Sequence, residues 1–390
     1  MITHLSFSGQ YYGRESAAFT LVKALQSKID VMMLLVVENR VGLQENEHLV
    51  EKMIEFNIKH EVINTDDKFS TATFKQLYAL INNHSINIIH CHCFKSVIYS
   101  LLIRLIYNKT FKIVFTLHGL ILPFNIKSII FKTINLLSVA LSDGVIGCTH
   151  KYLPLITVIP FIKNKTTVIV NSYEHGSNKL YTHDEARQVL KCYCGKLNGK
   201  LIVAFIGRFT AVKNPIFFLK IVGRIREKYS DAAIPVHFIM IGDGELKPDI
   251  ESYIRNHDLN SLVTLTGYIA DMSKVYPAID IVLMTSNVEG IPMCILESMS
   301  YSIPVIAPDV GGIPEVIRSG ETGLLFSKRN VLECTNHLIS LIELSQLKST
   351  LGKNSNEYLK SKFSYANSVN SHLRFYNQIL SDNAKLIPEC

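Results

Sequence analysis

Two carboxylates lie eight residues apart in the segment SNVEGIPMCILESMS, and their spacing raises the question of what chemistry they perform. The run IVLM before this segment predicts a strand, and Pro292 suits the first position of a following helix. Glu289 then lies in the loop, and Glu297 lies inside the helix, about one and a half turns from its start. The two side chains therefore do not share a helix face, and a paired acid and base is not expected.

Two cations follow another predicted strand, LIVAFIG. Arg208 and Lys213 flank a predicted helix start, where Asn214 suits the N-cap and Pro215 the first helical position. The free N–H groups and the dipole of a helix start favour an anion, so two cations beside one suit a diphosphate. By themselves, Arg and Lys in such a loop are more often only solvated charges.

The diphosphate interpretation is strengthened because the same strand–loop–helix pattern recurs. GIPMCI (290–295) and GIPEVI (312–317) each place a proline at a helix start, and IGDGEL (241–246) predicts a tight glycine turn into a helix. In a parallel sheet the carboxyl ends of the strands meet at one edge. We therefore expect these loops to line one rim of one domain.

The elements that must position these loops are short apolar strands alternating with helices, the pattern of parallel sheets covered on both faces. A chain of 390 residues exceeds the usual size of one core, and 48% hydrophobic residues are enough for two. A polar stretch at 171–183 separates two series of strands. We predict an α/β fold of two doubly wound Rossmann-like domains, residues 1–175 and 176–364, facing across a ligand cleft. The predicted strands are 2–7, 29–37, 60–64, 86–91, 112–117, 144–148 and 167–170, then 201–207, 236–242, 263–267, 279–284, 303–307 and 323–326.

Composition narrows the class of partner. The net charge of +7 is spread over single positions, which suggests anionic ligands or a membrane surface rather than nucleic acid. The start lacks a secretory pattern, and no stretch reaches the roughly 20 apolar residues of a spanning helix, so we expect a cytoplasmic protein. The region from Leu120 to Val145 is apolar with Lys127 and Lys132. It predicts an amphipathic helix, either packed on the core, which we favour, or lying on the inner face of a membrane.

The cysteines do not indicate a metal site. In a strand, His90 and His92 face one side and Cys91 and Cys93 the other, so HCHC offers no four-ligand set. The CYC pair has only one residue between its cysteines. We expect all eight cysteines to be reduced thiols, mostly buried.

Five motifs together resemble the nucleotide-sugar domain of glycosyltransferase family 4: GRFTAVKN, IGDGEL, LTGYI, EGIPMCILESMSYSIPVIAPDVGGIPEVI and ETGLLF, in this order over roughly residues 201–326. The resemblance implies a GT-B architecture and retention of anomeric configuration. It also implies no metal in the active site and no cofactor besides the donor substrate. A C-terminal helix, about residues 365–390, is expected to cross back to the first domain.

The resemblance also implies roles for individual residues. Arg208 and Lys213 would neutralise the donor diphosphate, whose charge grows as the glycosidic bond breaks. Glu289 would contact the sugar hydroxyls, Glu297 the ribose hydroxyls, and His118 after FTL the donor sugar. His90 and His92 either line the acceptor cleft with Lys95 or are satisfied core histidines. Further donor contacts are expected at the glycine loop (Gly9, Gly13), at the wall for the base (Tyr268, Ile269), and at the loop and helix start Gly290, Ile291, Pro292, Met293 and Cys294.

The sequence thus predicts a retaining glycosyltransferase of hexosyltransferase type. It would move a sugar from a UDP- or GDP-sugar to a glycan or lipid-linked acceptor in cell-envelope polysaccharide or glycolipid biosynthesis, with peripheral membrane contact left open. Two alternatives remain. One is a nucleotide-sugar epimerase on the same fold, and the other is a non-catalytic nucleotide-sugar-binding protein.

Overall fold

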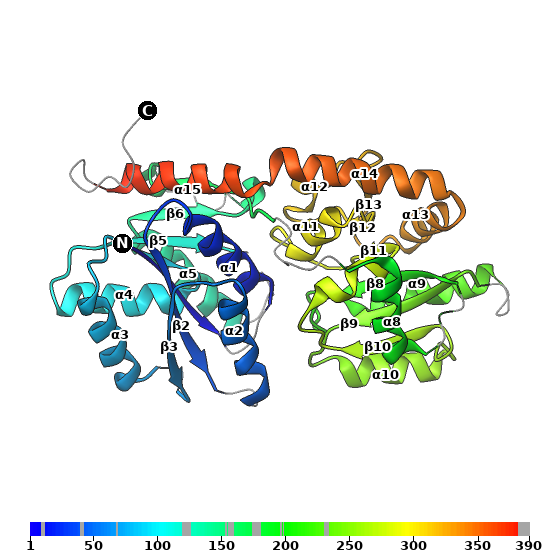
Figure 1. The fold of residues 1–390 in the computed structure, drawn as a ribbon, viewed down its shortest axis with the longest axis horizontal. Coiled ribbons are helices and arrows are strands. Elements are labelled where there is room, and N and C mark those ends of the chain that lie inside the picture. Colours follow the sequence, from blue (N-terminus) through cyan, green and yellow to red (C-terminus); the bar gives the residue numbers. More distant parts are fainter. Residues whose placement is uncertain are drawn as a thin grey trace. The chain divides into compact units, whose positions relative to one another are not determined.

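The chain folds into two compact units, each built on one parallel sheet with helices on both faces (Figure 1). The computed structural model describes residues 1–8, 12–39, 43–67, 69–118, 126–152, 154, 160–173, 181–195, 197, 199–229 and 234–380. Unit 1 comprises Met1–Ser172 and Phe363–Cys390, and unit 2 comprises Tyr173–Lys362. The sequence placed the corresponding changes near residues 175 and 365.

Unit 1 contains a seven-stranded sheet of order β3-β2-β1-β4-β5-β6-β7. Its strands are β1 (Ile2–Ser8), β2 (Val31–Glu38), β3 (His60–Thr65), β4 (Ile88–Cys91), β5 (Lys112–Leu117), β6 (Gly144–Gly147) and β7 (Thr166–Val168). Its helices are α1 (Gly13–Leu25), α2 (Leu43–Glu55), α3 (Thr71–Asn83), α4 (Phe94–Ile106), α5 (Ile126–Leu141), a 3-10 turn η1 (His150–Tyr152), α7 (Pro160–Lys163) and α15 (Tyr365–Ile379).

The two faces of this sheet carry separate apolar cores, because successive strand residues point to opposite sides. Val31, Met33 and Leu35 of β2 pack with α1, α2 and α15, whereas Leu34 and Val36 pack with residues of α3 and α4. The C-terminal helix α15 therefore belongs to unit 1, where it packs against α1 (Figure 1). Phe375 and Tyr376 of this helix are buried in the core of unit 1. Residues 381–390 of the expected helix lie outside the described part of the chain.

Unit 2 contains a six-stranded sheet of order β10-β9-β8-β11-β12-β13. Its strands are β8 (Leu201–Ile206), β9 (Val236–Ile241), β10 (Val263–Gly267), β11 (Ile281–Leu283), β12 (Val305–Pro308) and β13 (Leu324–Phe326). Its helices are α8 (His183–Cys194), α9 (Pro215–Lys228), α10 (Lys247–Asn256), 3-10 turns η3 (Met272–Lys274) and η4 (Tyr276–Ala278), α11 (Met293–Ser300), α12 (Ile313–Val316), α13 (Val331–Glu343) and α14 (Ser345–Lys362).

The thirteen predicted strands all occur, and the two-sheet α/β class is confirmed. The apolar runs identified them because central parallel strands are covered on both faces. Within the described residues, no helix is long and apolar enough to span a bilayer. Seven of the eight cysteines are described and all are free thiols, four of them buried.

Candidate functional site

The predicted loops lie together at the carboxyl edge of the unit 2 sheet. They follow β9, β8, β11 and β12, which are consecutive neighbours in the parallel sheet. The expectation of one shared rim is therefore confirmed. Backbone hydrogen bonds join the first two loops, with Phe209 N–H donating to the Asp243 carbonyl at 2.8 Å and Leu246 N–H to the Phe209 carbonyl at 2.9 Å.

Two glycines permit this close approach. A Cβ atom on Gly242 would lie 2.1 Å from the Gly207 carbonyl oxygen, and one on Gly244 would lie 2.6 Å from the Phe209 carbonyl oxygen. Both glycines also have positive φ angles, 140° and 155°, which other residues rarely adopt. The GDG turn of the sequence is thus the element that holds the Arg208 loop in place.

Lys213 lies at the end of that loop, just before α9. Asn214 occupies the N-cap position, but it adopts a left-handed conformation with φ 52° and its side chain makes no capping hydrogen bond. The predicted N-cap position of Asn214 is therefore confirmed, but its side chain does not cap the helix. The loop is held instead by the Thr285 hydroxyl, which donates to the carbonyls of Lys213 (3.2 Å) and Asn214 (3.0 Å).

Lys213 forms an ion pair with Glu289. The Lys213 Nζ atom lies 2.5 Å from Glu289 Oε1, and the side chains are 25% and 10% exposed. Burial lowers the pKa of Lys213, but the Glu289 carboxylate more than offsets this and the net pKa is raised. The ammonium is therefore charged at neutral pH. Sequence reasoning placed both residues at this rim but did not predict their direct contact.

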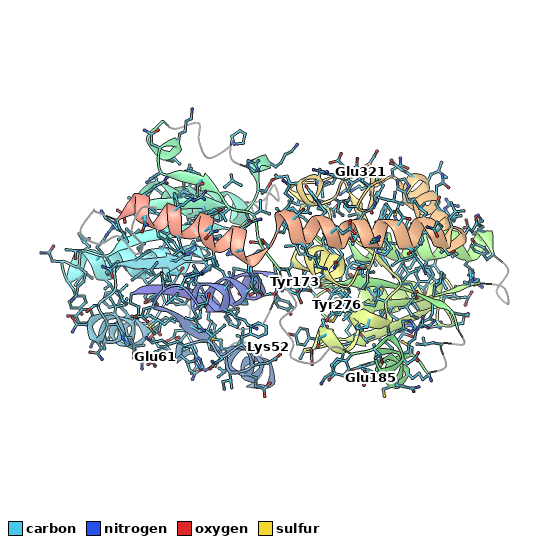
Figure 2. The ribbon with its side chains drawn as sticks, turned by 45° about the horizontal axis from the view of Figure 1, so that its top comes forward. Lys52, Glu61, Tyr173, Glu185, Tyr276 and Glu321 are labelled. Atoms are coloured by element: carbon cyan, nitrogen blue, oxygen red, sulfur yellow. The ribbon has the colours of Figure 1, made fainter. Side chains whose placement is uncertain are left out.

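Glu297 has a different partner. The buried Tyr276 hydroxyl donates to Glu297 Oε2 at 2.6 Å, and the Tyr276 ring stacks on Tyr301 with centroids 5.1 Å apart. Burial and the Glu297 carboxylate raise the pKa of Tyr276 well above its usual value, with a smaller effect from Tyr173. Tyr173 and Tyr276 are both labelled in Figure 2. The two glutamates thus have separate environments, as the sequence predicted.

Cys294 lies between these two carboxylates. Burial raises its pKa to about 12, and the charges of Lys213, Glu297 and Glu289 all act on it. The expected helix start is displaced by one residue, since Pro292 is the N-cap of α11 and the first helical residue is Met293. The first N–H groups of a helix have no partner within the helix, so those of Met293 and Cys294 suit the expected phosphate contact.

The other expected donor contacts of unit 2 are spread along the same rim. Arg208 is exposed two residues after the end of β8, and Tyr268 is exposed immediately after β10. Ile269, Gly290 and Glu297 are partly exposed, whereas Ile291 and Pro292 are buried. The exposed groups are available to a ligand, and the buried ones shape the backbone that would meet it.

The unit 1 candidates lie around a small cavity. His118 follows β5 directly and is partly exposed, and it lines this cavity with His92, Thr116, Cys148 and His372. About 20 Å³ of the cavity is open to the centres of water molecules, enough for a water molecule. Gly13 is the first residue of α1, and Gly9 lies outside the described residues.

His90 and His92 are core residues, with 0% and 2% exposure. The core alternative is therefore confirmed for His90, whereas His92 is buried but also borders the small cavity beside His118. Lys95 is bound to Glu38 in a part-buried ion pair. Cys91 and Cys93 are buried on the other side, as expected from the strand period.

Sequence reasoning missed the partners of these histidines. His4 is the register partner of His90 on the neighbouring strand, and Tyr376 reaches them from α15. One ring nitrogen from each of His4, His90 and His92 lies within 4.8 Å of the others. The sequence signal for this cluster was His4, a histidine in the first predicted strand.

Comparisons with known proteins agree with this architecture. Residues 200–344 match the family Glycosyl transferases group 1, and residues 7–149 match the family Glycosyl transferase 4-like. An uncharacterized glycosyltransferase of Methanocaldococcus jannaschii is 29% identical over 345 residues, which is 86% of this chain and 87% of that protein. A relative from Escherichia coli, UDP-Gal:alpha-D-GlcNAc-diphosphoundecaprenol alpha-1,3-galactosyltransferase, is 26% identical over 151 residues, 38% of each chain. The crystal structure of HepE from Anabaena with UDP and glucose has a TM-score of 0.78 at 18% identity, covering 96% of this chain and 98% of HepE.

The two parallel sheets and the structural match define a GT-B architecture. With one family match in each half of the sequence, the chain belongs to the GT-B glycosyltransferases of the family 4 kind. The expectation that the chain is a glycosyltransferase is thereby confirmed.

Proposed function

We propose that the protein transfers a sugar from a nucleoside-diphosphate sugar to a hydroxyl of a glycan or lipid-linked acceptor, with retention of anomeric configuration. The observation that carries the proposal is the charge arrangement at the unit 2 rim. Lys213 lies 2.5 Å from Glu289, and Glu297 accepts a hydrogen bond from Tyr276. A cation for the diphosphate, one carboxylate for the sugar and one for the ribose are the groups that such a donor requires.

The proposed donor is supported by the relatives. HepE was solved with UDP and with UDP-glucose, and the E. coli relative is named for UDP-Gal. We extend the donor class, a uridine or guanosine diphosphate sugar, to this chain on the basis of its own rim residues. Tyr268 and Ile269 would meet the base, and the N–H groups of Met293 and Cys294 would meet phosphate oxygens.

The proposed reaction needs no enzyme nucleophile. The bond between the anomeric carbon and the diphosphate oxygen breaks, and a bond to the acceptor oxygen forms on the same face. The acceptor proton passes to the departing diphosphate. Lys213 and Arg208 would stabilise the negative charge that grows on this leaving group. In other phosphate sites a divalent metal ion has this role. Glu289 would hold the sugar hydroxyls, and His118 would contact the sugar from unit 1.

We further propose that unit 1 binds a membrane surface, where a lipid-linked acceptor would be found. The end of α4 and the neighbouring α5 expose seven large apolar side chains, among them Leu105 at 79% and Ile106 at 59%. The complete set is Leu102, Leu105, Ile106, Tyr107, Leu136, Leu137 and Leu141, named here the α4–α5 patch. Scattered single apolar residues are normal on a surface, whereas seven on and beside two helices that contact each other favour an interaction site.

The charges around the α4–α5 patch indicate an anionic lipid surface. Both helices lack Asp and Glu and contain two basic residues each, although Lys95 is paired with Glu38 and Arg104 with Asp143. Lys165 lies at the end of α5, where its Nζ donates to the carbonyls of Ala140 and Ser142 at 2.6 Å. Exposed apolar side chains on helices without carboxylates suit the interface of a membrane, and anionic lipids would suit the basic residues of these helices. A membrane-bound enzyme of this kind would act on a lipid-linked acceptor at the cytoplasmic face.

The experiment that tests the reaction follows product by proton NMR. The enzyme is incubated with UDP-glucose, UDP-galactose or GDP-mannose, with and without alkyl glycosides as acceptors. We expect free nucleoside diphosphate and a product with the anomeric configuration of the donor. A product of opposite configuration would refute retention. Isomerised donor without acceptor would favour the epimerase alternative.

A further inference from the structure

Unit 1 contains a buried group of five histidines, out of 14 in the chain. They come from β1, β4, the residue after β4, the residue after β5, and α15. Four are at most 5% exposed, and the fifth, His118, borders the cavity. Burial lowers the pKa of each one, with smaller effects from neighbouring charges, and the five rings are therefore neutral at physiological pH. The group is His4, His90, His92, His118 and His372.

Four of these rings are joined with Tyr376 in one continuous chain of hydrogen bonds. From the cavity inward, His118 Nε2 lies 3.1 Å from His92 Nδ1, and His92 Nε2 lies 2.9 Å from His4 Nδ1. His4 Nε2 is 3.4 Å from the Tyr376 hydroxyl, which is 2.6 Å from His90 Nδ1. The inner end is His90 Nε2 at 2.5 Å from Thr116 Oγ1, and the outer end is His118 Nδ1 at 3.8 Å from Cys148 Sγ.

A neutral imidazole has one N–H donor and one acceptor nitrogen, so the protons of this chain must be ordered together. Three arrangements place a proton in every link: one direction along the chain, its reverse, and one in which the Tyr376 oxygen accepts from both His4 and His90. The link between Tyr376 and His90 selects among them. The Tyr376 hydroxyl has a single proton and lies 2.6 Å from His90 but 3.4 Å from His4, so we place this proton on the shorter contact. Tyr376 therefore donates to His90, and His90 donates to Thr116.

The same order then determines the protons on the other rings. Tyr376 accepts from His4, His4 Nδ1 accepts from His92, and His92 Nδ1 accepts from His118 Nε2–H. The Nδ1 atom of His118 is left unprotonated beside the cavity, with the Cys148 thiol as a weak donor. Burial raises the pKa of Cys148 to about 12, so this group is a thiol at neutral pH.

We propose that Tyr376 is a positioning residue that, through His4 and His92, holds His118 as the Nε2–H tautomer, so that Nδ1 accepts a hydrogen bond from a substrate hydroxyl. This inference rests on the proposed function only for the identity of the substrate. The chain of hydrogen bonds itself lies within unit 1. Through this chain, Tyr376 of α15 determines whether the His118 nitrogen at the cavity is a hydrogen-bond donor or an acceptor.

The grouping of His4, His90 and His92 also has the composition of a metal site. Their ring nitrogens, however, are occupied by the contacts above, and the positive charge of Arg14 lowers the pKa of His92. No Asp or Glu belongs to this cluster among the described residues. Neutral rings that bond one another therefore fit a hydrogen-bonded chain better than a divalent cation, and a chelator distinguishes the two.

The test is the tautomeric state of His118 in the full-length protein. Selective ¹⁵N labelling of histidine with long-range proton–nitrogen spectra at neutral pH distinguishes protonated from unprotonated ring nitrogens. We expect His118 to be protonated at Nε2 alone, and its spectrum to be unaffected by EDTA. In Tyr376→Phe, which retains the packed ring, we expect His118 to populate the Nδ1–H form. Tyr365→Phe, at the start of the same helix, is the matched control and should leave the tautomer unchanged.

Three results would overturn the proposal: an Nδ1-protonated His118 in the wild type, an unchanged His118 in Tyr376→Phe, or a spectrum that EDTA changes. His237, His257 and His337 of unit 2 serve as internal references for intact folding. If Tyr376→Phe does not fold, Thr116→Val removes the acceptor at the inner end and should also mix the His118 tautomers. These spectra need no donor, so they can fail or succeed independently of nucleotide-sugar binding.

Discussion

Lys213 Nζ and Glu289 Oε1 lie 2.5 Å apart, although 76 residues separate them in the chain. The ion pair joins the cation proposed for the diphosphate to the carboxylate proposed for the sugar. Both side chains are largely shielded from water, which makes their interaction stronger than that of an exposed pair. A donor entering this site would therefore meet a lysine whose position is already set by the glutamate.

Replacing Lys213 with Ala should reduce kcat by about 100-fold or more, because a preorganised charge on the leaving group is lost. Arg208→Ala should act in the same direction. Lys220→Ala, an exposed lysine of α9, is the matched control and should leave kcat unchanged. Steady-state kinetics and thermal unfolding of the same samples separate catalysis from folding. Equal rates in the Lys213, Arg208 and Lys220 variants would refute the diphosphate assignment.

The two glutamates should differ in which constant they control. Glu297→Gln should weaken binding of the free nucleoside diphosphate by about 1.5 kcal/mol or more, because it removes a charged acceptor for the ribose. Glu289→Gln should leave that affinity nearly unchanged and reduce kcat with the intact donor. Calorimetric titration and turnover assays measure the two effects. If both variants lost nucleotide affinity equally, the separate roles would be wrong.

Stability should fall as the pH is lowered through the range of the buried histidines. Burial lowers the pKa of His4 and His118 to about 3 and that of His372 to about 4, from 6.5 in the unfolded chain. Below pH 6.5 the unfolded state takes up protons that the folded state does not. The free energy of unfolding is therefore highest above pH 6.5. It falls as the pH is lowered from 6.5 toward the pKa of each histidine in the folded state, by about 1.4 kcal/mol per pH unit for each such histidine.

Urea unfolding between pH 7.5 and 5 measures this dependence. His372→Gln should make the pH dependence shallower, whereas His257→Gln, an exposed histidine of unit 2, should leave it unchanged. A free energy of unfolding that stays constant from pH 6.5 to 5 would contradict the neutral buried state of these rings.

The α4–α5 patch should bind vesicles that contain phosphatidylglycerol. Changing both Leu105 and Ile106 to Gln removes two exposed apolar side chains, each worth up to about 1.5 kcal/mol on full burial, so vesicle affinity should fall at least about tenfold. Leu332→Gln, at a 71% exposed leucine of α13, is the control. Flotation measures binding, and it should weaken in high salt.

Wild-type protein that does not float with anionic vesicles would refute the membrane surface. Light scattering of the same samples identifies the competing outcome. If Leu105→Gln with Ile106→Gln converted a dimer into a monomer, the patch would be an interface between two copies of the chain instead.

The strands and the shared rim were predictable because they depend on local patterns. Apolar runs marked the thirteen strands, and parallel pairing alone brings their carboxyl ends to one edge. Helix starts were less accurate. Pro292 is the N-cap rather than the first helical residue, and Asn214 adopts a left-handed conformation in a loop that Thr285 holds from the segment after β11.

The contacts between distant residues could not be predicted from spacing. The strand period placed His90 and His92 on one face, but their partners His4 and Tyr376 come from the opposite ends of the sequence. Tyr276 likewise reaches Glu297 from a separate turn. Such pairs depend on the packing of α15 and η4 against the sheets, which a pattern within one segment does not encode.

The central claim, that the unit 2 rim holds a nucleoside diphosphate, is tested most directly by thermal unfolding with UDP, GDP and ADP and with their sugars. We predict that one base series stabilises the wild-type protein, by about 2.7 kcal/mol at 100 times the dissociation constant. The same ligand should stabilise Lys213→Ala and Glu297→Gln much less. If none of these nucleotides stabilised the wild type, or if both variants responded as the wild type does, the account would be contradicted.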